Sequence, residues 1–261
     1  MTEMTAGTVD KQALALRFGH AAQHYDRYAR FQQDVGQHLL SLIPDGKHEV
    51  VLDLGCGTGF FLQSLQPLSE QLLALDLASG MLHQARQRHQ QALFLCGDAE
   101  QLPLAAASLD VVFSSLAIQW CHSYTDLLAE LYRVIRPGGY LVFATLCQGS
   151  LDELRHAWAC LDSFDHVNHF VPEPQLRTWS EQQGFRCVHW ESRKHGLQYQ
   201  NLRDLLMGLK GIGASQVSGV RQGGLGGRER LRRLECAYEQ QRDLSGFLPL
   251  SYEVCYGVLV R

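Results

Sequence analysis

A glycine-rich loop with an aspartate just ahead of it is the feature of this sequence most able to bind a ligand. Asp53 stands inside the apolar run 50–54, two residues before the first glycine of GCGTG, whose glycines are at 55, 57 and 59. Glycine allows positive φ and lets a ligand approach the main chain without meeting a Cβ. Because a carboxylate attracts a cationic amine and repels phosphate, the combination favours a nucleotide-like ligand that carries an amine.

The glycine spacing argues against two common nucleotide sites. A dinucleotide fingerprint requires G-x-G-x-x-G, but Phe60 occupies its third glycine position. A P-loop requires Gly-Lys-Ser or Gly-Lys-Thr, and neither follows. The loop is predicted to open a helix, whose N-terminal N–H groups favour an electron-rich ligand. The alternative is a strand–helix turn with no ligand.

Two further aspartates follow predicted strands. Asp76 lies near the end of the apolar run 72–78, where an acid accepts hydrogen bonds from both hydroxyls of a ribose. Its alternative role is a helix N-cap, although Ser79 is available for that. Asp98 follows the third strand, 92–96, and either accepts from an adenine amino group or forms a turn.

Strands and helices must alternate to position these side chains. The predicted strands are 50–54, 72–78, 92–96, 109–114 and 140–146, and helices are predicted at 79–89 and 124–135. This alternation is typical of a parallel sheet with helices on both faces, in which ligands bind outside the carboxyl ends of the strands. Gln119 and Trp120 follow the fourth strand, where an acceptor would meet the ligand.

Two helices precede this core, one from Asp10 to Tyr28 and one from Phe31 to Leu42. Tyr25 belongs to an apolar stripe at helical spacing, which is typical of core packing. The same tyrosine is also placed to close over a bound ligand. Both interpretations stay open at this point.

The second half of the chain is less regular. Helices are predicted at 150–161 and 173–183, a strand at 185–192, a long insert at 193–245 and two β segments within 248–260. Between residues 193 and 233 nine cations face two carboxylates, and a glycine-rich stretch, 219–230, is typical of a lid loop. The cations form either a solvated helix face or a docking surface for an acidic partner.

Composition narrows the class of protein. With 261 residues, 46% of them hydrophobic, the chain is long enough to bury a core as one large α/β domain. A net charge of −4 gives no whole-protein attraction to nucleic acid or to an anionic membrane. No apolar run is long enough to cross a membrane, and no segment resembles a signal peptide. We therefore predict a soluble cytoplasmic protein with neither nucleic acid nor membrane as a partner. We also expect a monomer.

The cysteine and histidine patterns argue against metal. The eight cysteines contain no C-x-x-C pair, which favours reduced and mostly buried thiols. His166 and His169 have an H-x-x-H spacing but no third ligand nearby, and Pro172 favours a loop there. No metal site is predicted.

Several motifs together resemble a known family. LDLGCGTG (52–59), Asp76, GDAEQLPL (97–104) and LYRVIRPGGYLVFATL (131–146) resemble motifs I to post-III of the class I S-adenosylmethionine methyltransferases. Six segments along the rest of the chain are similar to the malonyl-acyl-carrier-protein O-methyltransferases of biotin synthesis: 18–32, 114–121, 145–158, 166–170, 205–214 and 248–260. One departure is His20, where that family commonly has arginine, so no role of that arginine is carried over.

The resemblance implies a Rossmann-like class I methyltransferase fold. We expect a mostly parallel seven-stranded sheet with helices on both faces, an antiparallel last strand and a helical lid. The chain is expected to form one domain, 1–261, with N-terminal helices at 10–43, a cofactor-binding core at 48–146 and lid insertions at about 147–172 and 193–245.

The resemblance also implies an activity. We expect transfer of a methyl group from S-adenosylmethionine to the free carboxylate of a malonyl thioester on acyl carrier protein, giving the methyl ester that primes biotin synthesis and S-adenosylhomocysteine. The carboxylate is already ionised at neutral pH, so no general base is expected. The alternatives are methylation of a small free acid or quinone and a catalytically silent cofactor-binding regulator.

Roles follow for individual residues. The residues expected to contact the cofactor are Asp53, Gly55, Cys56, Gly57, Gly59, Asp76, Leu77, Met81, Asp98, Ala99 and Ser115. Those expected to orient the acceptor are Tyr25, Gln119 and Trp120. Those expected to bind the carrier protein are Arg203, Lys210, Arg221, Arg228, Arg230, Arg232 and Arg233.

Overall fold

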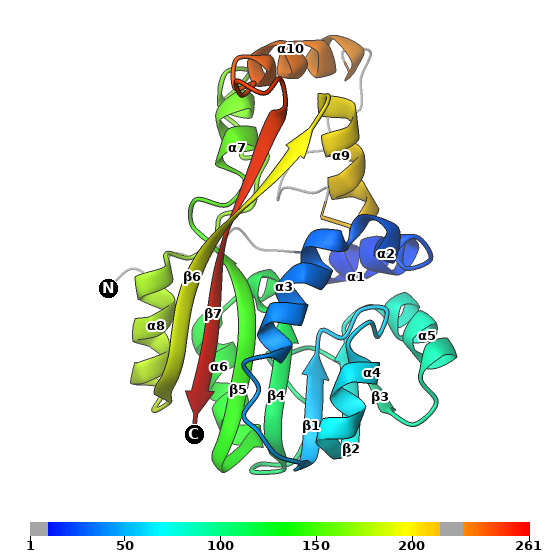
Figure 1. The fold of residues 1–261 in the computed structure, drawn as a ribbon, viewed down its shortest axis with the longest axis vertical. Helices are drawn as coiled ribbons and strands as arrows, with labels where there is room; N and C mark the ends of the chain where they lie inside the picture. The colour runs from blue at the N-terminus through cyan, green and yellow to red at the C-terminus, as the bar shows by residue number, and fades with distance from the viewer. Residues whose placement is uncertain (1–9, 215–226) are drawn as a thin grey trace.

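A seven-stranded sheet forms the centre of the protein (Figure 1). The structure is a computed structural model and describes residues 10–214 and 227–261. The strands are β1 His48–Leu54, β2 Ser69–Asp76, β3 Leu93–Cys96, β4 Leu109–Ser115, β5 Ile135–Cys147, β6 Arg186–Tyr199 and β7 Leu248–Val260. Their order is β3-β2-β1-β4-β5-β7-β6. The first five strands are parallel, and β7 is antiparallel to both β5 and β6. The predicted mostly parallel sheet with an antiparallel last strand is confirmed.

Helices cover both faces of this sheet. In chain order they are α1 Lys11–Ala21, α2 Tyr25–Tyr28, α3 Arg30–Leu40, α4 Leu62–Leu65, α5 Ser79–Arg88, α6 Tyr124–Val134, α7 Asp152–Ala159, α8 Glu173–Gln182, α9 Leu202–Gly211 and α10 Gly227–Glu239. Two short 3-10 helices, η1 Gln66–Leu68 and η2 Ile118–Trp120, follow α4 and β4. Within the described residues, no helix is both long and apolar enough to cross a membrane.

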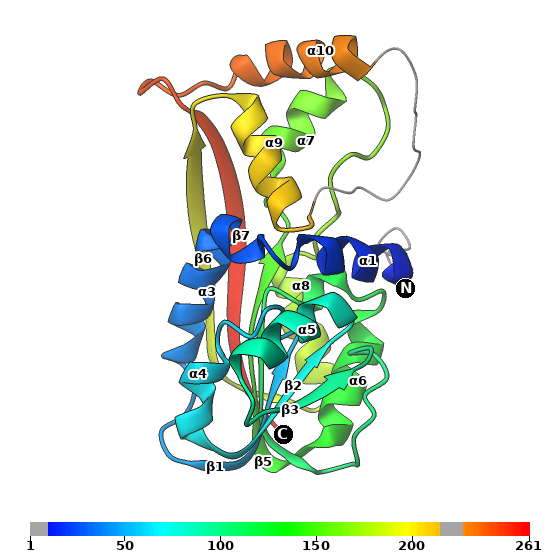
Figure 2. The ribbon, with the colours of Figure 1, turned by 90° about the vertical axis from the view of Figure 1, so that its right-hand side faces the viewer.

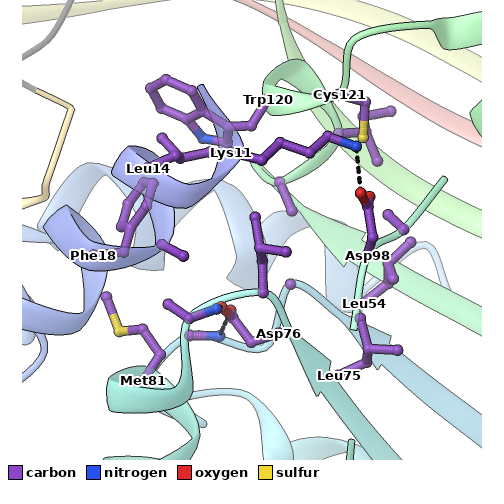
Figure 3. Close-up of a pocket in the computed structure, with 18 of the residues that line it drawn as sticks. Lys11, Leu14, Phe18, Leu54, Leu75, Asp76, Met81, Asp98, Trp120 and Cys121 are labelled. Atoms are coloured by element: carbon purple, nitrogen blue, oxygen red, sulfur yellow. Dashed lines mark hydrogen bonds and ion pairs between the residues drawn. The ribbon is translucent and has the colours of Figure 1, made fainter. Parts of the chain in front are cut away.

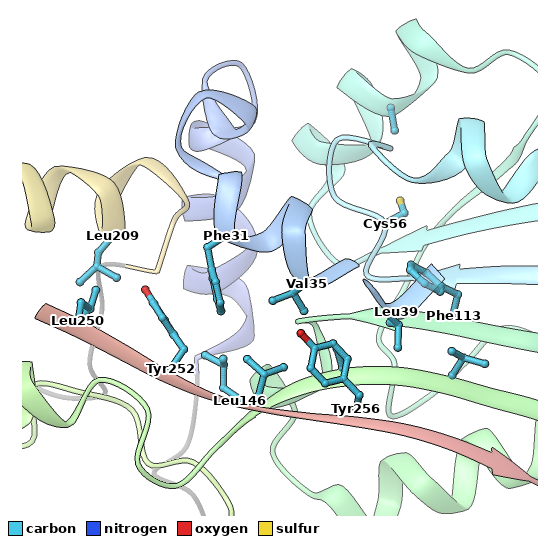
Figure 4. Packing of buried hydrophobic residues seen from close by; sticks show 14 of the residues in the cluster. Phe31, Val35, Leu39, Cys56, Phe113, Leu146, Leu209, Leu250, Tyr252 and Tyr256 are labelled. Atoms are coloured by element: carbon cyan, nitrogen blue, oxygen red, sulfur yellow. The ribbon is translucent and has the colours of Figure 1, made fainter. Parts of the chain in front are cut away.

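The strands are apolar on both sides because helices bury both faces. Along β1, Val51 belongs to the core beneath α3 and α4, whereas Leu52 belongs to the core beneath α6 and α8. On the first face, Phe31 of α3 stacks on Tyr252 of β7, with ring centroids 4.2 Å apart (Figure 4). This alternation is the pattern expected of a sheet with both faces covered.

The upper parts of β6 and β7 extend beyond the parallel strands and carry a lobe made of α7, α9 and α10 (Figure 1). Helix α1 lies across the carboxyl ends of the parallel strands, between the sheet and this lobe (Figure 2). The elements predicted as lid insertions therefore lie on the side of the sheet where ligands of parallel sheets bind.

Four predictions about elements were wrong in detail. The first helix is interrupted at 22–24, so Tyr25 begins a separate short helix. The glycine loop is followed by a helix of only four residues, α4, too short to act as a dipole site. Strand β6 continues to Tyr199, into the predicted insert, because it pairs with β7 along its whole length. Residues 248–260 form one strand and not two segments. The predicted lid loop, the glycine-rich stretch 219–230, lies largely outside the described residues.

A glycine in β7 gives a test of this packing. A Cβ added at Gly257 would lie 2.4 Å from the ring of Phe143, which is buried on the neighbouring strand β5. The change Gly257→Ala is expected to lower the free energy of unfolding by about 1–3 kcal/mol, the usual cost of overpacking. Gly196→Ala in β6 is the control, because no atom lies within 4 Å of a Cβ there. Chemical denaturation measures both, and equal stabilities would contradict the packing described.

Candidate active site

A cavity of about 120 Å³ opens at the carboxyl ends of β1, β2 and β4, beneath α1 (Figure 3). Eight of the residues predicted to contact the cofactor line it: Gly55, Gly57, Asp76, Leu77, Met81, Asp98, Ala99 and Ser115. Three do not, namely Asp53, Cys56 and Gly59. The parallel sheet thus brings together side chains that lie up to 60 residues apart in the sequence, as the carboxyl ends of neighbouring strands must.

Asp76 ends β2 and organises the loop opposite. Its Oδ1 accepts a hydrogen bond from the backbone N–H of Ala78 at 2.7 Å, and its Oδ2 accepts one from the N–H of Gly57 at 2.9 Å. Burial raises the pKa of this carboxyl, against the effect of these two bonds. Helix α5 begins at Ser79 with Ala78 as its N-cap and no side-chain cap bond, so Asp76 is not a conventional N-cap. Each of its oxygens keeps a lone pair for a ligand in the cavity.

The glycine loop fits a ligand because of its backbone conformation. Gly55 has φ +76° and Gly57 has φ +53°, both in the region that favours glycine. No atom lies within 4 Å of a Cβ built at Gly57, so the missing side chain leaves open space at the cavity wall. At Gly59, by contrast, an added Cβ would lie 3.0 Å from the Cβ of Ala85 on α5, and Cys56 is buried. Gly59 and Cys56 therefore shape the loop from behind the wall.

Asp53 lies beside the cavity without lining it. The side chain is 2% exposed, and its Oδ2 has no hydrogen-bond partner among the described residues. Burial, together with the charge of Asp76, raises the pKa of Asp53 to about 8. A protonated carboxyl at neutral pH is the state expected when no cation is near it.

Cofactor affinity should therefore depend on pH through Asp53. A cationic ligand stabilises the ionised carboxylate, so binding should release a proton and become tighter as pH rises toward about 8. By the same linkage, Asp53 makes the ligand-free protein less stable as pH rises from its unfolded pKa to about 8, because the folded state holds the proton longer. Titration calorimetry in buffers of different ionisation enthalpy measures the number of protons released on binding. Asp53→Asn should bind without this proton release, and an equal release in both proteins would contradict the assignment.

Lys11 of α1 also lines this cavity, and the sequence interpretation missed it. Its Nζ lies 2.5 Å from Oδ2 of Asp98 (Figure 3) and also contacts Glu100. Asp98 accepts a further bond from the N–H of Glu100 at 3.1 Å, so it is both a turn residue and a cavity residue. The Lys11 contact ties α1 down over the cavity. No local pattern marks Lys11, because its partners are 87 and 89 residues away.

A second cavity adjoins the first and has a largely apolar lining. Phe18, Tyr25, Leu116 and Trp120 line both cavities and form the boundary between them. The other residues of the second cavity are Phe31, Gln32, Gln119, Leu146, Leu151, Leu154, His166, Val167, Asn168, Phe170, Leu209, Ile212, Ala214 and Tyr252. None of the described lining residues is lysine or arginine. All three predicted acceptor-orienting residues, Tyr25, Gln119 and Trp120, line this cavity.

Tyr25 is held at the boundary by its neighbour. Asp26 accepts a hydrogen bond from the hydroxyl of Thr58 in the glycine loop at 2.7 Å and lies 2.5 Å from Nη1 of Arg88 on α5. Desolvation, with smaller effects of Asp76 and Asp26, raises the pKa of Tyr25, which keeps its hydroxyl a donor. Neither this hydroxyl nor the indole N–H of Trp120 has a hydrogen-bond partner among the described residues. Two donors are thus available where the cavities meet.

Gln119 and Trp120 are aimed by a strained turn after β4. Leu116 has φ +52°, a conformation that is rare for a bulky residue and is enriched at functional sites. The amide Nε2 of Gln119 donates to the carbonyl of Leu116 at 2.7 Å, and its Oε1 accepts from the hydroxyl of Thr145 at 3.3 Å. The hydroxyl of Tyr124 lies 3.4 Å from that of Thr145. These contacts leave one N–H of Gln119 for a group in the second cavity.

The predicted carrier-binding cations do not form one group. Arg203 and Lys210 are exposed on α9, whereas Arg228, Arg230, Arg232 and Arg233 belong to α10; Arg221 lies outside the described residues. Arg230 is engaged within the protein, since its Nη2 lies 2.6 Å from Asp162 and its guanidinium stacks over Trp158 at 5.1 Å. His20, the departure from the family pattern, is exposed on α1.

The described residues contain no group of three or more histidine, cysteine, aspartate or glutamate side chains that could hold a metal ion. His166 is hydrogen-bonded to Asp162 at 2.7 Å and His169 lies 3.2 Å from Asp165, so each of the H-x-x-H histidines has a carboxylate partner. All eight cysteines are unpaired. Four of them are buried and three are exposed, so the expected burial holds for only half of them.

Comparisons with known proteins agree with this geometry. The family model described as a methyltransferase domain matches residues 52–143. The malonyl-[acyl-carrier protein] O-methyltransferase of Serratia marcescens is 45% identical over 254 residues, which cover 97% of each chain. The bifunctional biotin-biosynthesis protein BioHC of Cellvibrio japonicus is 44% identical over 99% of this chain, which spans about half (52%) of that longer protein.

Among solved structures, a putative methyltransferase from Bacillus halodurans is similar, with a TM-score of 0.64, 18% identity, and coverage of 87% of this chain and 98% of the other. At that identity the likeness shows a shared fold, that of the class I methyltransferases. The sequence identity to the carrier-protein enzymes is higher, and the matched region includes the residues that line both cavities. The chain belongs to the malonyl-[acyl-carrier protein] O-methyltransferase family of S-adenosylmethionine-dependent enzymes.

Proposed function

We propose that this protein transfers a methyl group from S-adenosylmethionine to the free carboxylate of a malonyl group carried by acyl carrier protein, in the branch of metabolism that makes biotin. The observation that supports this best is the pair of adjoining cavities separated by Phe18, Tyr25, Leu116 and Trp120. One cavity has the donors and acceptors of a nucleoside site, and the other is apolar with a few neutral donors. The acceptor itself is proposed from the names of the relatives.

The residues of the first cavity fit S-adenosylmethionine. Asp76 would hold the ribose hydroxyls, Asp98 the adenine amino group, and Gly57 gives room for the ligand against the main chain. The unpaired, buried Oδ2 of Asp53 fits a neighbouring cation better than it fits an empty apolar wall. When bound, S-adenosylmethionine supplies an electrophilic methyl group on a sulfonium sulfur.

The second cavity suits an anionic acceptor that must stay reactive. Its described lining has no lysine or arginine that would form an ion pair with a carboxylate and lower its nucleophilicity. Tyr25, Gln119 and Trp120 can instead donate neutral hydrogen bonds that orient the carboxylate toward the first cavity. Attack of an anion on a cationic centre disperses charge, and excluding water favours such a reaction because water stabilises the separate charges more than the transition state. No proton has to move.

The protein is proposed to act as a monomer. The eight unpaired cysteines are consistent with the proposed cytoplasmic location, a reducing compartment.

A panel of acceptors tests the proposal. Radiolabelled methyl transfer should be efficient with malonyl carrier protein, and weak with free malonate and with a quinone. A preference for malonate or the quinone would support the small-acceptor alternative. Cofactor binding without transfer to any acceptor would support a regulator that only binds the cofactor.

A further inference from the structure

The outer face of α9 presents two cations on either side of an exposed methionine. Arg203, Met207 and Lys210 follow a spacing of four and then three residues, so they lie on one side of the helix. Met207 is 44% exposed, and neither cation has an ion-pair partner among the described residues. The opposite side, with Leu202, Leu205 and Leu209, is buried. An exposed apolar residue between unpaired cations is typical of a surface that meets an acidic partner.

The neighbouring helices α2 and α3 continue this surface. Tyr28 of α2 is 42% exposed, and a Cβ added at Gly211 of α9 would lie 2.3 Å from its ring, so the two helices are in direct contact. Arg27 and Arg30 on either side of Tyr28 are exposed and have no ion-pair partner among the described residues. The sequence interpretation did not select these two arginines, since they lie about 170 residues from α9.

Acids do not cancel this charge. The exposed carboxylates of α9 and α3 are Asp204 and Asp34, and Asp204 accepts a hydrogen bond from the side chain of Asn201 at 3.0 Å. Asp26 is engaged with Arg88 and Thr58. Four unpaired cations thus face two exposed acids across the joined surface of α2, the start of α3, and α9, which we call the α2–α9 face.

The same helices form part of the second cavity from within. Leu209 at the end of α9 and Ile212 just after it line that cavity, as do Tyr25 of α2 and Phe31 of α3. Any protein docked on the α2–α9 face would therefore lie over elements that enclose the acceptor. An acyl group carried on a flexible arm could enter between them with little rearrangement of the carrier.

Helix α10 is less suited to the same role. It forms the far end of the upper lobe, whereas α9 reaches down to α2 (Figure 1). No residue of α10 lines the second cavity. Its four arginines accompany three glutamates, Glu229, Glu235 and Glu239, and Arg230 is already engaged with Asp162.

We infer that the α2–α9 face is the docking surface for an acidic carrier protein, with Arg27, Arg30, Arg203 and Lys210 as its charged contacts and Tyr28 and Met207 as its apolar ones. This inference rests on the proposed function, since it takes the acceptor to be carrier-bound. It replaces the α10 cluster of the sequence interpretation and adds two arginines from the other end of the chain.

Charge reversal tests the surface. The double variant Arg27→Glu/Lys210→Glu should raise KM for malonyl carrier protein by roughly tenfold or more and reduce its salt dependence, because steering by opposite charge is lost. The matched control, Arg228→Glu/Arg233→Glu on α10, changes the same number of charges and should alter KM by less than about threefold. Both variants should keep the cofactor affinity and the thermal stability of the unchanged protein.

A malonyl thioester of N-acetylcysteamine, which has no carrier, separates docking from catalysis. Turnover of this small substrate should be the same in both variants and in the unchanged protein. Equal KM increases in the two variants, or an equal loss with the small thioester, would overturn the docking assignment. Failure of the unchanged protein to methylate either malonyl substrate would overturn the proposed function itself, and the docking assignment with it.

Discussion

Replacing Asp76 by alanine is expected to weaken S-adenosylmethionine binding by about 2–3 kcal/mol, a factor of roughly 30 to 150. The carboxylate loses its charge-assisted bonds to the ribose hydroxyls, and the loop opposite loses the bond that Oδ2 accepts from the Gly57 N–H at 2.9 Å. Titration calorimetry measures the affinity. The affinity of Asp76→Asn should lie between those of the unchanged protein and Asp76→Ala, because the amide oxygen of asparagine can replace only one of the two carboxylate oxygens.

Asp110 provides the matched control for this prediction. Its Oδ2 accepts a hydrogen bond from the backbone N–H of Val50 at 2.7 Å, so it too organises the main chain, but it does not line the cavity. Asp110→Ala should therefore cost stability without changing the affinity for the cofactor. An Asp76→Ala protein that folds and binds normally would leave Asp76 as a loop organiser alone.

The second large effect is expected at Gln119. Gln119→Leu removes a donor that orients the carboxylate in the second cavity and should lower kcat by roughly 100-fold with cofactor affinity unchanged, because a small misalignment of the reacting atoms has an effect of that size. Thr145 is buried and does not line either cavity, yet its hydroxyl donates to Gln119 at 3.3 Å. Thr145→Val should lower kcat by roughly tenfold, because the Gln119 amide loses the contact that fixes its orientation.

A double-mutant cycle distinguishes positioning from general damage. If Thr145 acts through Gln119, Thr145→Val should have no further effect in a Gln119→Leu background, and Thr145→Ser should restore activity in the original background. Additive losses in the double variant would show that Thr145 affects the reaction by another route. Single-turnover rates with saturating cofactor make this comparison.

The alternating core of the fold could be predicted because its signals are local. The apolar core of each parallel strand is a short run in the sequence, and the first three strands end at or just before a glycine or an aspartate. The side chains that follow such ends must meet at one edge of the sheet. Asp76 and Asp98 were placed at the cavity by this rule alone. The antiparallel last strand came from resemblance, since no pattern in 248–260 fixes its direction.

Features that depend on distant partners could not be predicted. The segment around Ala22 has good helical propensity, and the interruption before Tyr25 accompanies the tie between Asp26, Thr58 and Arg88. Strand β6 continues through polar residues as far as Tyr199 because β7 supplies a paired edge. Sequence patterns reveal neither feature, because tertiary contacts determine where the helix is interrupted and where the strand ends.

Charge patterns were the least informative signal. A count of cations between residues 193 and 233 cannot tell an engaged arginine such as Arg230 from a free one such as Arg203, because the partner Asp162 lies 68 residues away. Asp53 is a related case. The sequence suggested direct contact with the cofactor, whereas the structure buries Asp53 beside the cavity, where its effect would be electrostatic.

The central claim, that a carrier-bound malonyl carboxylate receives the methyl group, is tested most directly by intact-protein mass spectrometry of the carrier after reaction. Malonyl carrier protein should gain the mass of one CH2 unit, only when both enzyme and S-adenosylmethionine are present, and mild base should release methanol from the product. Acetyl carrier protein, which has no free carboxylate, should stay unchanged. A gain on acetyl carrier protein, or none on malonyl carrier protein while a free acid is methylated, would contradict the account.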